Sequence, residues 1–212
     1  MGTDNVALKK IIGEIKGLQK DGYEIAISLG GGNLIRGATA PVNDKPIAHQ
    51  MGMLATVING LAFKVALTEA GVKSQTMSAL FMPEIAKPFT VNKGRAALKA
   101  KDVVVLVGGT GRPFLTSDTG TAIRAAELTC DVVIKMTQVD GIYTKDPRKE
   151  KNAKKIPEIS YDELLEKKLE IMDFAAVNIL KDVGIPIIVC KTTESLKNIL
   201  QGKGTYSIVR SK

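Results

Sequence analysis

The fold is decided by residues 103–136, VVVLVGGTGRPFLTSDTGTAIRAAELTCDVVIKM. The apolar run Val103–Val107 predicts a strand buried on both faces, and a loop rich in glycine and hydroxyl residues follows it. An Ala-rich helix and a second apolar strand, Asp131–Met136, come next. The loop joins the carboxyl end of a strand to the amino end of a helix, which is where an open α/β sheet binds anions. We therefore expect a phosphate-bearing ligand at this loop.

Strands and helices alternate along the rest of the chain, which predicts one α/β domain, residues 1–212, with a buried and mostly parallel sheet. Further strands are expected at Tyr23–Leu29, Thr76–Leu80, Ile185–Cys190 and Thr205–Val209. Helices are expected over residues 8–18 and at His49–Ala70, Tyr161–Lys167, Met172–Val183 and Glu194–Gln201, and Ala96–Ala100 is expected to close a further helix. In the longest helix we expect the inward side chains to be Leu54, Val57, Ile58, Leu61 and Val65.

The composition is that of a globular protein, with 44% hydrophobic and 25% charged residues among 212. The net charge of +8 suits polyphosphate ligands, and the few aromatic residues argue against nucleic acid as a partner. We find no apolar run of the length that a membrane span needs, so no membrane partner is expected. Cys130 and Cys190 lie in apolar settings, which predicts reduced cysteines in a cytoplasmic protein.

A glycine-rich segment, GGGNLIRG at residues 30–37, ends the second expected element. Three glycines let the backbone approach a ligand closely, and Arg36 offers a planar fork for phosphate. The segment is not a dinucleotide fingerprint, because Ile35 stands where the third glycine belongs, and the chain has no Walker A motif. An ordinary strand-to-loop turn is the alternative.

The loop after Val107 contains hydroxyl groups and amides that can donate to anionic oxygens, at Thr116 and Ser117 among others. Asp118 needs a cation, a hydroxyl or an arginine as partner. The alternative is that Ser117 or Asp118 only caps a helix beginning near Thr119.

Lys135 interrupts the apolar strand VVIKM, which is costly unless its ammonium meets an anion or carboxylate. The following VDG turn and Tyr143 suggest a loop beside a flat ligand, although a lysine that reaches to solvent is the alternative. His49 is the only histidine and is expected to be a surface or capping residue. We find no catalytic triad and no cluster with metal-ligand spacing.

Taken together, the motifs resemble those of the bacterial uridylate kinases (UMP kinases) of the amino-acid kinase family, over essentially the whole chain. The segments that carry the resemblance are GGGNLIRG (30–37), MGMLATVINGLA (51–62), GTGRPFLTSDT (109–119), DVVIKMTQVDGIYTKDP (131–147) and MDFAAV (172–177). The resemblance implies a three-layer αβα sandwich and the reaction ATP + UMP → ADP + UDP in pyrimidine nucleotide biosynthesis. It also implies Mg²⁺ as cofactor, a homohexamer, activation by GTP and inhibition by UTP.

The resemblance also implies roles for single residues. UMP is expected at Gly31, Thr110, Gly111, Arg112, Pro113, Phe114, Leu115, Thr116 and Ser117. ATP is expected at Gly32, Arg36, Thr137, Tyr143 and Asp146. The residues expected in the reaction region are Arg36, Asp118, Lys135 and Asp173, and no residue is assigned as a metal ligand.

Two departures from the family pattern bear on activity. Members have an earlier strand ending in a K-L-S-G-E-like loop, whereas this sequence begins MGTDNVALKK, the equivalent of the helix after that strand. His49, or Gln50 in a neighbouring alignment, stands where the family has an aspartate that recognises the nucleoside of UMP. The alternative is therefore a catalytically degenerate nucleotide-binding or regulatory protein of the same fold. An amino-acid kinase relative acting on carbamate or an acidic amino acid is disfavoured by the segment TGRPFLTSDT.

Overall fold

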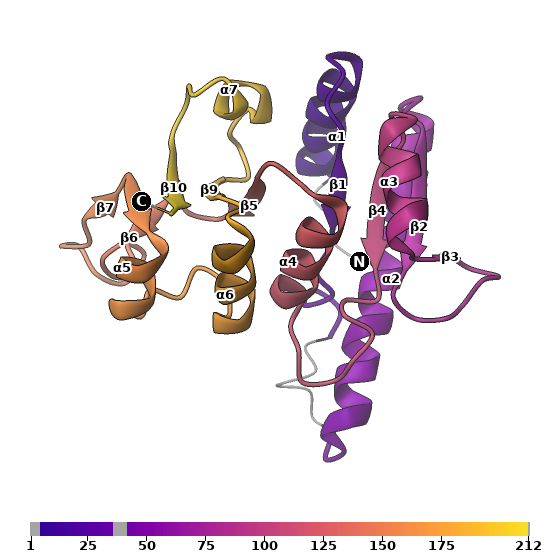
Figure 1. Ribbon diagram of the computed structural model, residues 1–212, viewed down its shortest axis with the longest axis horizontal. Helices are drawn as coiled ribbons and strands as arrows, with labels where there is room; N and C mark the ends of the chain where they lie inside the picture. The colour runs from indigo at the N-terminus through magenta and orange to yellow at the C-terminus, as the bar shows by residue number, and fades with distance from the viewer. Residues whose placement is uncertain (1–4, 36–41, 212) are drawn as a thin grey trace. The chain divides into compact units, whose positions relative to one another are not determined.

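The computed structural model describes residues 5–35 and 42–211, and the chain divides into two units, Met1–Thr121 and Ala122–Lys212. Figure 1 shows the first unit in indigo to red and the second in red to yellow. Each unit contains its own four-stranded sheet. Arg36 lies outside the described residues. The predicted single domain remains a prediction.

The sheet of the first unit is entirely parallel, with the strand order β1-β4-β2-β3. Its elements are α1 (Asn5–Lys20), β1 (Ala26–Ser28), α2 (Lys45–Glu69), β2 (Ser74–Ser78), β3 (Lys87–Pro88), α3 (Val91–Lys99) and β4 (Val103–Val107). The short strand β3 contains Pro88, which has no backbone N–H to donate to a neighbouring strand. Proline is tolerated there because β3 is at the edge of the sheet.

Helices cover both faces of this sheet. Every residue of β4 is buried, as predicted for a strand enclosed on both sides. Val103, Val105 and Val107 pack with α1 and α2 in one core cluster. Because side chains alternate along a strand, Val104 and Leu106 point to the opposite face. The helix α3 is in contact with β4.

The prediction for the inward face of α2 is wrong for three residues. Leu54, Ile58 and Val65 are 47%, 56% and 56% exposed, whereas Val57 is buried as expected. The side chains that α2 buries are instead Ala48, Met53, Ala55, Thr56, Val57, Gly60, Phe63 and Leu67. Apolar residues surround this helix, so periodicity alone could not identify the buried face.

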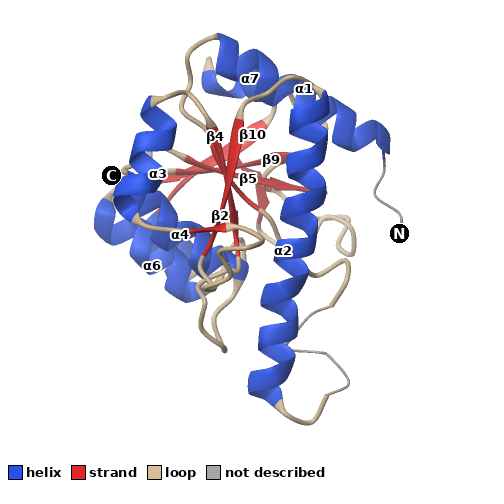
Figure 2. Ribbon diagram, turned by 90° about the vertical axis from the view of Figure 1, so that its right-hand side faces the viewer, coloured by secondary structure: helices blue, strands red, loops and turns tan. Residues whose placement is uncertain are grey.

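The length and composition of α2 also contradict the expectation that no stretch is apolar enough to cross a membrane. Among the described residues, this helix alone satisfies that criterion, and 39% of the relevant window is buried in the structure. A single helix of this kind is weak grounds for a membrane span, because core helices satisfy the same criterion. In Figure 2, α2 extends past the strands of its own unit.

The second unit contains a mixed sheet with the order β5-β9-β10-β8, in which only β9 and β10 are antiparallel. Its strands are β5 (Val133–Thr137), β8 (Glu158–Ser160), β9 (Ile187–Lys191) and β10 (Tyr206–Arg210), and a separate antiparallel pair is formed by β6 (Ile142–Tyr143) and β7 (Lys155–Ile156). Its helices are α5 (Tyr161–Glu166), α6 (Phe174–Val183) and α7 (Leu196–Leu200). The helix α4 (Ser117–Leu128) spans the boundary between the two ranges.

Both faces of the second sheet are also covered. One face packs its apolar side chains with α5, α6 and the end of α4, in a core centred on Ile187 and Val189. The other face contributes Ile188 and Cys190, which pack with Ile199 of α7. Helices on both faces of a mostly parallel sheet give the α/β, αβα layering that was predicted.

Candidate functional site

The glycine turn after β1 is held by α2. Gly31 is buried, and a methyl group added to it would come within 2.7 Å of the Gly52 carbonyl oxygen and 2.8 Å of the Ala55 Cβ. Neither neighbour is a flexible side-chain end, so only glycine fits at position 31. The Asn59 amide donates to the Gly30 carbonyl at 2.7 Å and to the Asn33 side chain at 2.7 Å. Packing against α2 therefore shapes this turn.

The turn leaves its outer part accessible. Gly32 and Asn33 are exposed, while the Leu34 and Ile35 amides donate to the Gly31 carbonyl at 3.0 Å. Gly32 is therefore accessible, and its contact with ATP stays a prediction.

The loop after β4 is attached to α2 at its first residue. The buried Gly108 amide donates to the Thr56 hydroxyl at 2.7 Å, and that hydroxyl donates to the Met53 carbonyl at 2.7 Å. Gly108, Gly109 and Gly111 all have positive φ angles, of 80°, 56° and 74°. Glycine adopts this left-handed conformation without steric cost, so the glycine-rich sequence allows the sharp path of the loop.

Further along the loop, the side chain of Thr110 accepts a hydrogen bond from the Arg112 amide at 3.1 Å. Phe114 has a φ angle of 66° and is 64% exposed. Its ring lies 5.0 Å from the His49 ring, at an interplanar angle of 53°. His49 is therefore a contact of the predicted UMP loop and not an isolated capping residue.

The loop ends at the N-terminus of α4, where the capping residue is Thr116. Its hydroxyl accepts from the Asp118 amide at 3.0 Å and from the Thr119 amide at 3.4 Å. The alternative that Ser117 or Asp118 only caps a helix starting near Thr119 is wrong, because the helix begins at Ser117. Asp118 lies in its first turn, where the helix dipole favours a carboxylate.

A close approach of α4 to the loop fixes the start of this helix. A methyl group on Gly120 would lie 3.1 Å from the Gly109 carbonyl carbon. The loop from Thr110 to Ser117 is thus confined by α2 at one end and α4 at the other. Within the first unit, the turn at Gly31 and this loop both contact α2, the helix that contains His49.

In the second unit, Lys135 is a half-buried residue of β5, paired in register with Val189. Thr137 ends this strand, and its hydroxyl donates to the Val139 carbonyl at 2.9 Å. The Thr137 carbonyl accepts from the Thr192 amide at 2.9 Å. A hydroxyl-stabilised turn therefore begins at Thr137, the first of the predicted ATP residues in this unit.

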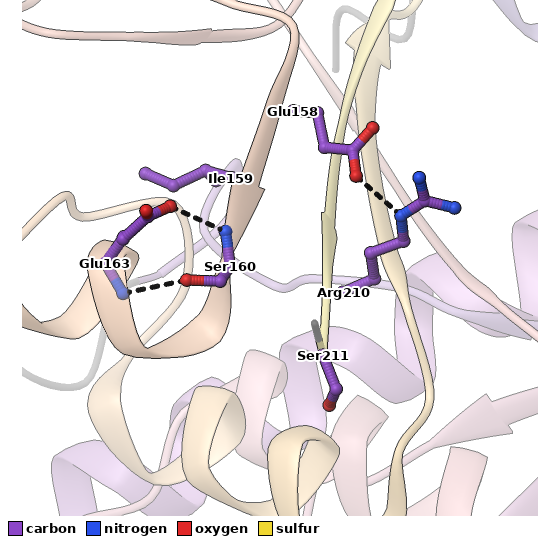
Figure 3. Close-up of a pocket in the computed structure, with 6 residues that line it drawn as sticks. All are labelled: Glu158, Ile159, Ser160, Glu163, Arg210 and Ser211. Atoms are coloured by element: carbon purple, nitrogen blue, oxygen red, sulfur yellow. Dashed lines mark hydrogen bonds and ion pairs between the residues drawn. The ribbon is translucent and has the colours of Figure 1, made fainter.

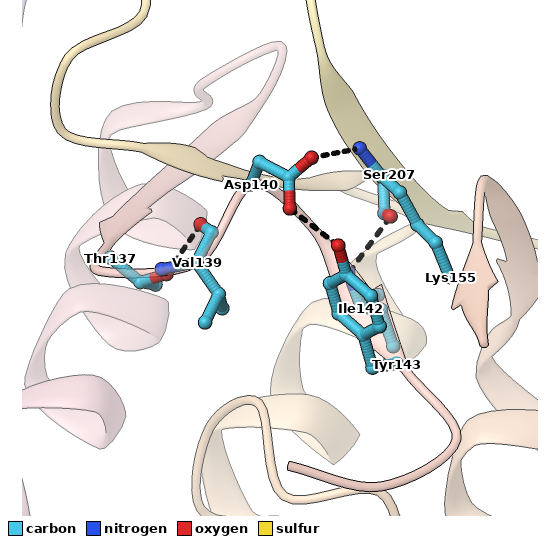
Figure 4. A network of polar contacts seen from close by, with 7 residues as sticks. All are labelled: Thr137, Val139, Asp140, Ile142, Tyr143, Lys155 and Ser207. Carbon is cyan, nitrogen blue, oxygen red and sulfur yellow. Dashed lines mark hydrogen bonds and ion pairs between the residues drawn. The ribbon is translucent and has the colours of Figure 1, made fainter. Parts of the chain in front are cut away.

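The side chain of Asp140 connects Tyr143 with Lys155 (Figure 4). The Tyr143 hydroxyl donates to Asp140 Oδ1 at 2.6 Å, and Lys155 Nζ donates to Asp140 Oδ2 at 3.0 Å. The hydrogen bond from Tyr143, followed by that from Lys155, lowers the pKa of Asp140. The same carboxylate raises the pKa of the Tyr143 phenol. The segment is also held at Ile142, whose amide donates to the Ser207 hydroxyl at 2.8 Å.

Asp146 accepts hydrogen bonds from Arg148 Nε at 3.0 Å and Arg148 Nη2 at 2.9 Å. This bidentate hydrogen bonding by Arg148 lowers the pKa of Asp146 to about 2. Asp173 is the N-cap of α6, because its Oδ1 accepts from the Ala176 amide at 2.9 Å. Both aspartates therefore have structural contacts in addition to their predicted roles.

Sequence reasoning missed several residues that shape these loops. They are Thr56, Asn59, Asp140, Arg148, Lys155 and Ser207. Two of them had a visible signal, because Thr56 and Asn59 are polar residues in the apolar segment 51–62. The others become partners only through tertiary contacts.

One hollow of about 340 Å³ lies elsewhere in the second unit, lined by Glu158, Ile159, Ser160, Glu163, Arg210 and Ser211. Figure 3 shows the Glu158 carboxylate facing Arg210, and Ser160 bonded reciprocally with Glu163. None of the predicted site residues lines it, and four of its polar side chains bond in two pairs, Glu158 with Arg210 and Ser160 with Glu163. Within residues 5–35 and 42–211, no group of three His, Cys, Asp or Glu side chains could hold a metal ion.

Comparison with known proteins identifies the family. The model of the amino acid kinase family matches residues 1–191. The chain belongs to the amino acid kinase family. It is 42% identical to the uridylate kinase of Brucella anthropi, covering 98% of this chain and 88% of that protein. It is 39% identical to the uridylate kinase of Bacteroides thetaiotaomicron, covering 99% and 91%.

Solved structures of amino acid kinase relatives agree with the fold. The UMP kinase of Ureaplasma parvum has a TM-score of 0.91 at 30% identity and covers all of this chain and 94% of its own. The UMP kinase of Bacillus anthracis has a TM-score of 0.94 at 28% identity and covers all of this chain and 89% of its own. The predicted resemblance and the predicted fold class are confirmed.

Proposed function

We propose that this chain is an ATP-dependent UMP kinase, a phosphotransferase that converts ATP and UMP to ADP and UDP. The main support for this proposal is the 42% identity to a uridylate kinase over 98% of the chain. The similarity includes the loop Gly109–Thr119, in which glycines have left-handed backbone angles and the chain enters the N-terminus of α4, where the helix dipole favours an anion. The degenerate, regulatory alternative is less favoured, because the similarity extends over nearly the whole length.

The first unit would bind the acceptor. Gly31 and the loop Thr110–Ser117 would hold UMP, with its phosphate near the N-terminus of α4, where the helix dipole favours negative charge. Arg112 is exposed and offers a guanidinium to the same anion. Phe114 offers an exposed ring to the nucleobase.

The second unit would bind the nucleoside of the donor, at Thr137, Tyr143 and Asp146. The donor phosphates would contact Gly32 and Arg36. In the reaction, the bond between the γ-phosphorus and the β,γ-bridging oxygen breaks, and a bond to a UMP phosphate oxygen forms. Protein groups contribute mainly by positioning the substrates and by neutralising charge.

Four residues would act in the reaction region. The cations Arg36 and Lys135 would stabilise negative charge that develops on the transferred phosphoryl group. Asp118 and Asp173 would orient groups there, and both are held at the N-terminus of a helix, in α4 and α6 respectively. Lys135 is half-buried in β5, and a charged side chain in such a position is stabilised by an anion or a carboxylate.

Mg²⁺ would enter with ATP. Mg²⁺ in nucleotide enzymes is held largely by substrate phosphates and by one or two carboxylates. This fits the described residues, which contain no three-residue ligand cluster but offer single aspartates such as Asp118. When bound, the ion supplies charge neutralisation on the phosphates.

A coupled assay of ADP release tests the proposal, with UMP, CMP and dCMP as acceptors at millimolar concentration. We expect turnover with UMP. Absence of turnover with all three acceptors would exclude the enzyme function, and nucleotide binding without turnover would favour the degenerate alternative. The variant Asp118→Asn is compared with the wild-type chain in the same assay, since it keeps the shape of the side chain and removes its charge.

The assembly is proposed to be a homo-oligomer, a hexamer by family resemblance. Supporting this, α2 exposes Ile47, Met51, Leu54, Ile58 and Val65 at spacings of three, four or seven residues. These spacings form the apolar seam typical of helices that pair with another helix. A second copy of this chain is the occupant that we propose.

The double variant Leu54→Glu/Ile58→Glu tests this interface, with the mass of the assembly measured by light scattering as the protein elutes from a size-exclusion column. We expect a smaller assembly, whereas Val6→Glu, a control at an exposed residue of α1, should leave the mass unchanged. An unchanged mass of the double variant would exclude α2 as the interface.

The remaining parts of the proposal are regulation, location and domain organisation. We propose activation by GTP, inhibition by UTP, and a single amino-acid kinase domain over residues 1–212. We propose a cytoplasmic location, with which the free thiols of Cys130 and Cys190 agree. Adding GTP or UTP to the coupled assay tests the regulation directly.

A further inference from the structure

We propose that Asp140 is a positioning residue for the donor nucleotide, and that Lys155 acts through it. The inference rests on the proposed function, because it concerns the residues that would hold ATP. Neither residue is among those predicted from the sequence to bind a substrate. Their role follows from the contacts of Tyr143, which is predicted to bind ATP.

The two oxygens of the Asp140 carboxylate bind two different partners. One oxygen accepts from the Tyr143 hydroxyl at 2.6 Å, and the other accepts from Lys155 Nζ at 3.0 Å. Hydrogen bonds that involve an ionised partner are stronger than neutral ones. Because both oxygens are engaged, the carboxylate cannot rotate without losing one bond. The orientation of the Tyr143 ring is thereby coupled to Lys155, which lies in another strand.

The backbone that follows Asp140 is held in place by its neighbours. Gly141 is buried, and a methyl group added there would lie 2.4 Å from Ser207 Oγ and 2.6 Å from Lys155 Cε. The next residue, Ile142, donates its amide to the same Ser207 hydroxyl at 2.8 Å. The segment is therefore fixed from both sides, as Figure 4 shows. A rigid backbone makes the side-chain contacts of Asp140 decisive for the position of Tyr143.

Tyr143 remains partly accessible to a ligand. Asp140, Tyr143 and Lys155 are each only partly buried, so part of the Tyr143 residue retains an accessible face that a ligand can contact. A buried structural network would have no such face. The same contacts that hold the ring thus leave it available to a nucleobase or ribose.

Steady-state kinetics of the full chain test the inference with Asp140→Asn, Lys155→Met and Tyr143→Phe. We expect the KM for ATP to rise about fivefold to tenfold in Asp140→Asn, since each tenfold change corresponds to about 1.4 kcal/mol. The KM for UMP should stay within about twofold, a difference that a general loss of stability would not produce. Lys155→Arg should restore much of the ATP affinity lost in Lys155→Met.

Glu158→Gln is the matched control, because it breaks the exposed ion pair with Arg210 in the same unit and should leave both KM values unchanged. Direct titration with a fluorescent ATP analogue separates this inference from the proposed function. If the wild-type chain lacks turnover but Asp140→Asn still weakens analogue binding, the positioning role stands without the kinase function. If the wild-type chain is active and Asp140→Asn has an unchanged KM for ATP, the positioning role is overturned. A soluble variant with a Tm near that of wild type is required for either conclusion, and Tyr143→Phe supplies a milder second test if Asp140→Asn does not fold.

Discussion

Replacing Thr56 with valine tests how α2 anchors the predicted UMP loop. Valine keeps the shape of the side chain but removes the hydroxyl that accepts from the Gly108 amide at 2.7 Å. Both residues are buried, so water cannot replace the lost acceptor. Sequence reasoning gave no role to Thr56, which makes the prediction a test of the tertiary structure.

The expected loss follows from the unpaired amide. Leaving a buried donor without a partner costs about 1–3 kcal/mol. In a chain of this length, ~1 kcal/mol lowers the Tm by about 2–4 °C, so we expect a decrease of about 2–12 °C. The loop begins at Gly108, and we therefore expect the KM for UMP to rise about threefold to tenfold while the KM for ATP stays unchanged.

Thermal unfolding and steady-state kinetics measure both effects. Thr68→Val is the matched control on the same helix, because its exposed hydroxyl donates to the Lys64 carbonyl at 3.0 Å in the same way. That control should change the free energy of unfolding by no more than about 0.5 kcal/mol. Equal Tm values and equal KM values for UMP in the two variants would refute the anchoring role of Thr56.

Three further predictions concern other contacts of the site. Gly31→Ala should lower the free energy of unfolding by about 1–3 kcal/mol in a denaturant titration, since the added methyl group overlaps α2 backbone; no change would contradict the tight packing. His49→Ala should raise the KM for UMP about twofold to tenfold by removing the ring contact with Phe114, and an unchanged value would exclude that contact from binding. The pKa of Asp146 is lowered from 3.8 to about 2, so its ion pair with Arg148 is fully present above pH 3.8 and is lost as the pH falls toward 2. Arg148→Met should move the NMR titration midpoint of that carboxyl up toward 3.8, and an unmoved midpoint would assign the shift to another cause.

The strand β4 and the start of the anion-binding loop could be predicted because local sequence dictates them. A run of five apolar residues, four of them valine, followed by glycines is typical of a strand buried on both faces, and those glycines allow left-handed backbone angles. The residues considered as the cap of α4, Ser117 and Asp118, lie one and two residues after the capping residue of the structure, Thr116. Thr116, Ser117 and Asp118 all have capping chemistry, and only the path of the loop selects Thr116.

The buried face of α2 could not be predicted, because its apolar side chains surround the helix and the neighbouring sheet decides which of them are enclosed. The partners of Asp140 were equally inaccessible to sequence reasoning. Lys155 is 15 residues away along the chain, and its ammonium reaches the carboxylate only after β6 and β7 pair.

The sequence by itself determined the α/β alternation, the glycine-rich loops and the family resemblance, since each depends on residues that are close together in the chain. Only the tertiary structure decided that Thr56 anchors the UMP loop, that His49 contacts Phe114, and that Leu54, Ile58 and Val65 face outward. The physical reason is that hydrogen-bond partners and burial depend on which distant elements pack together, and the spacing of residues along one segment does not contain that information.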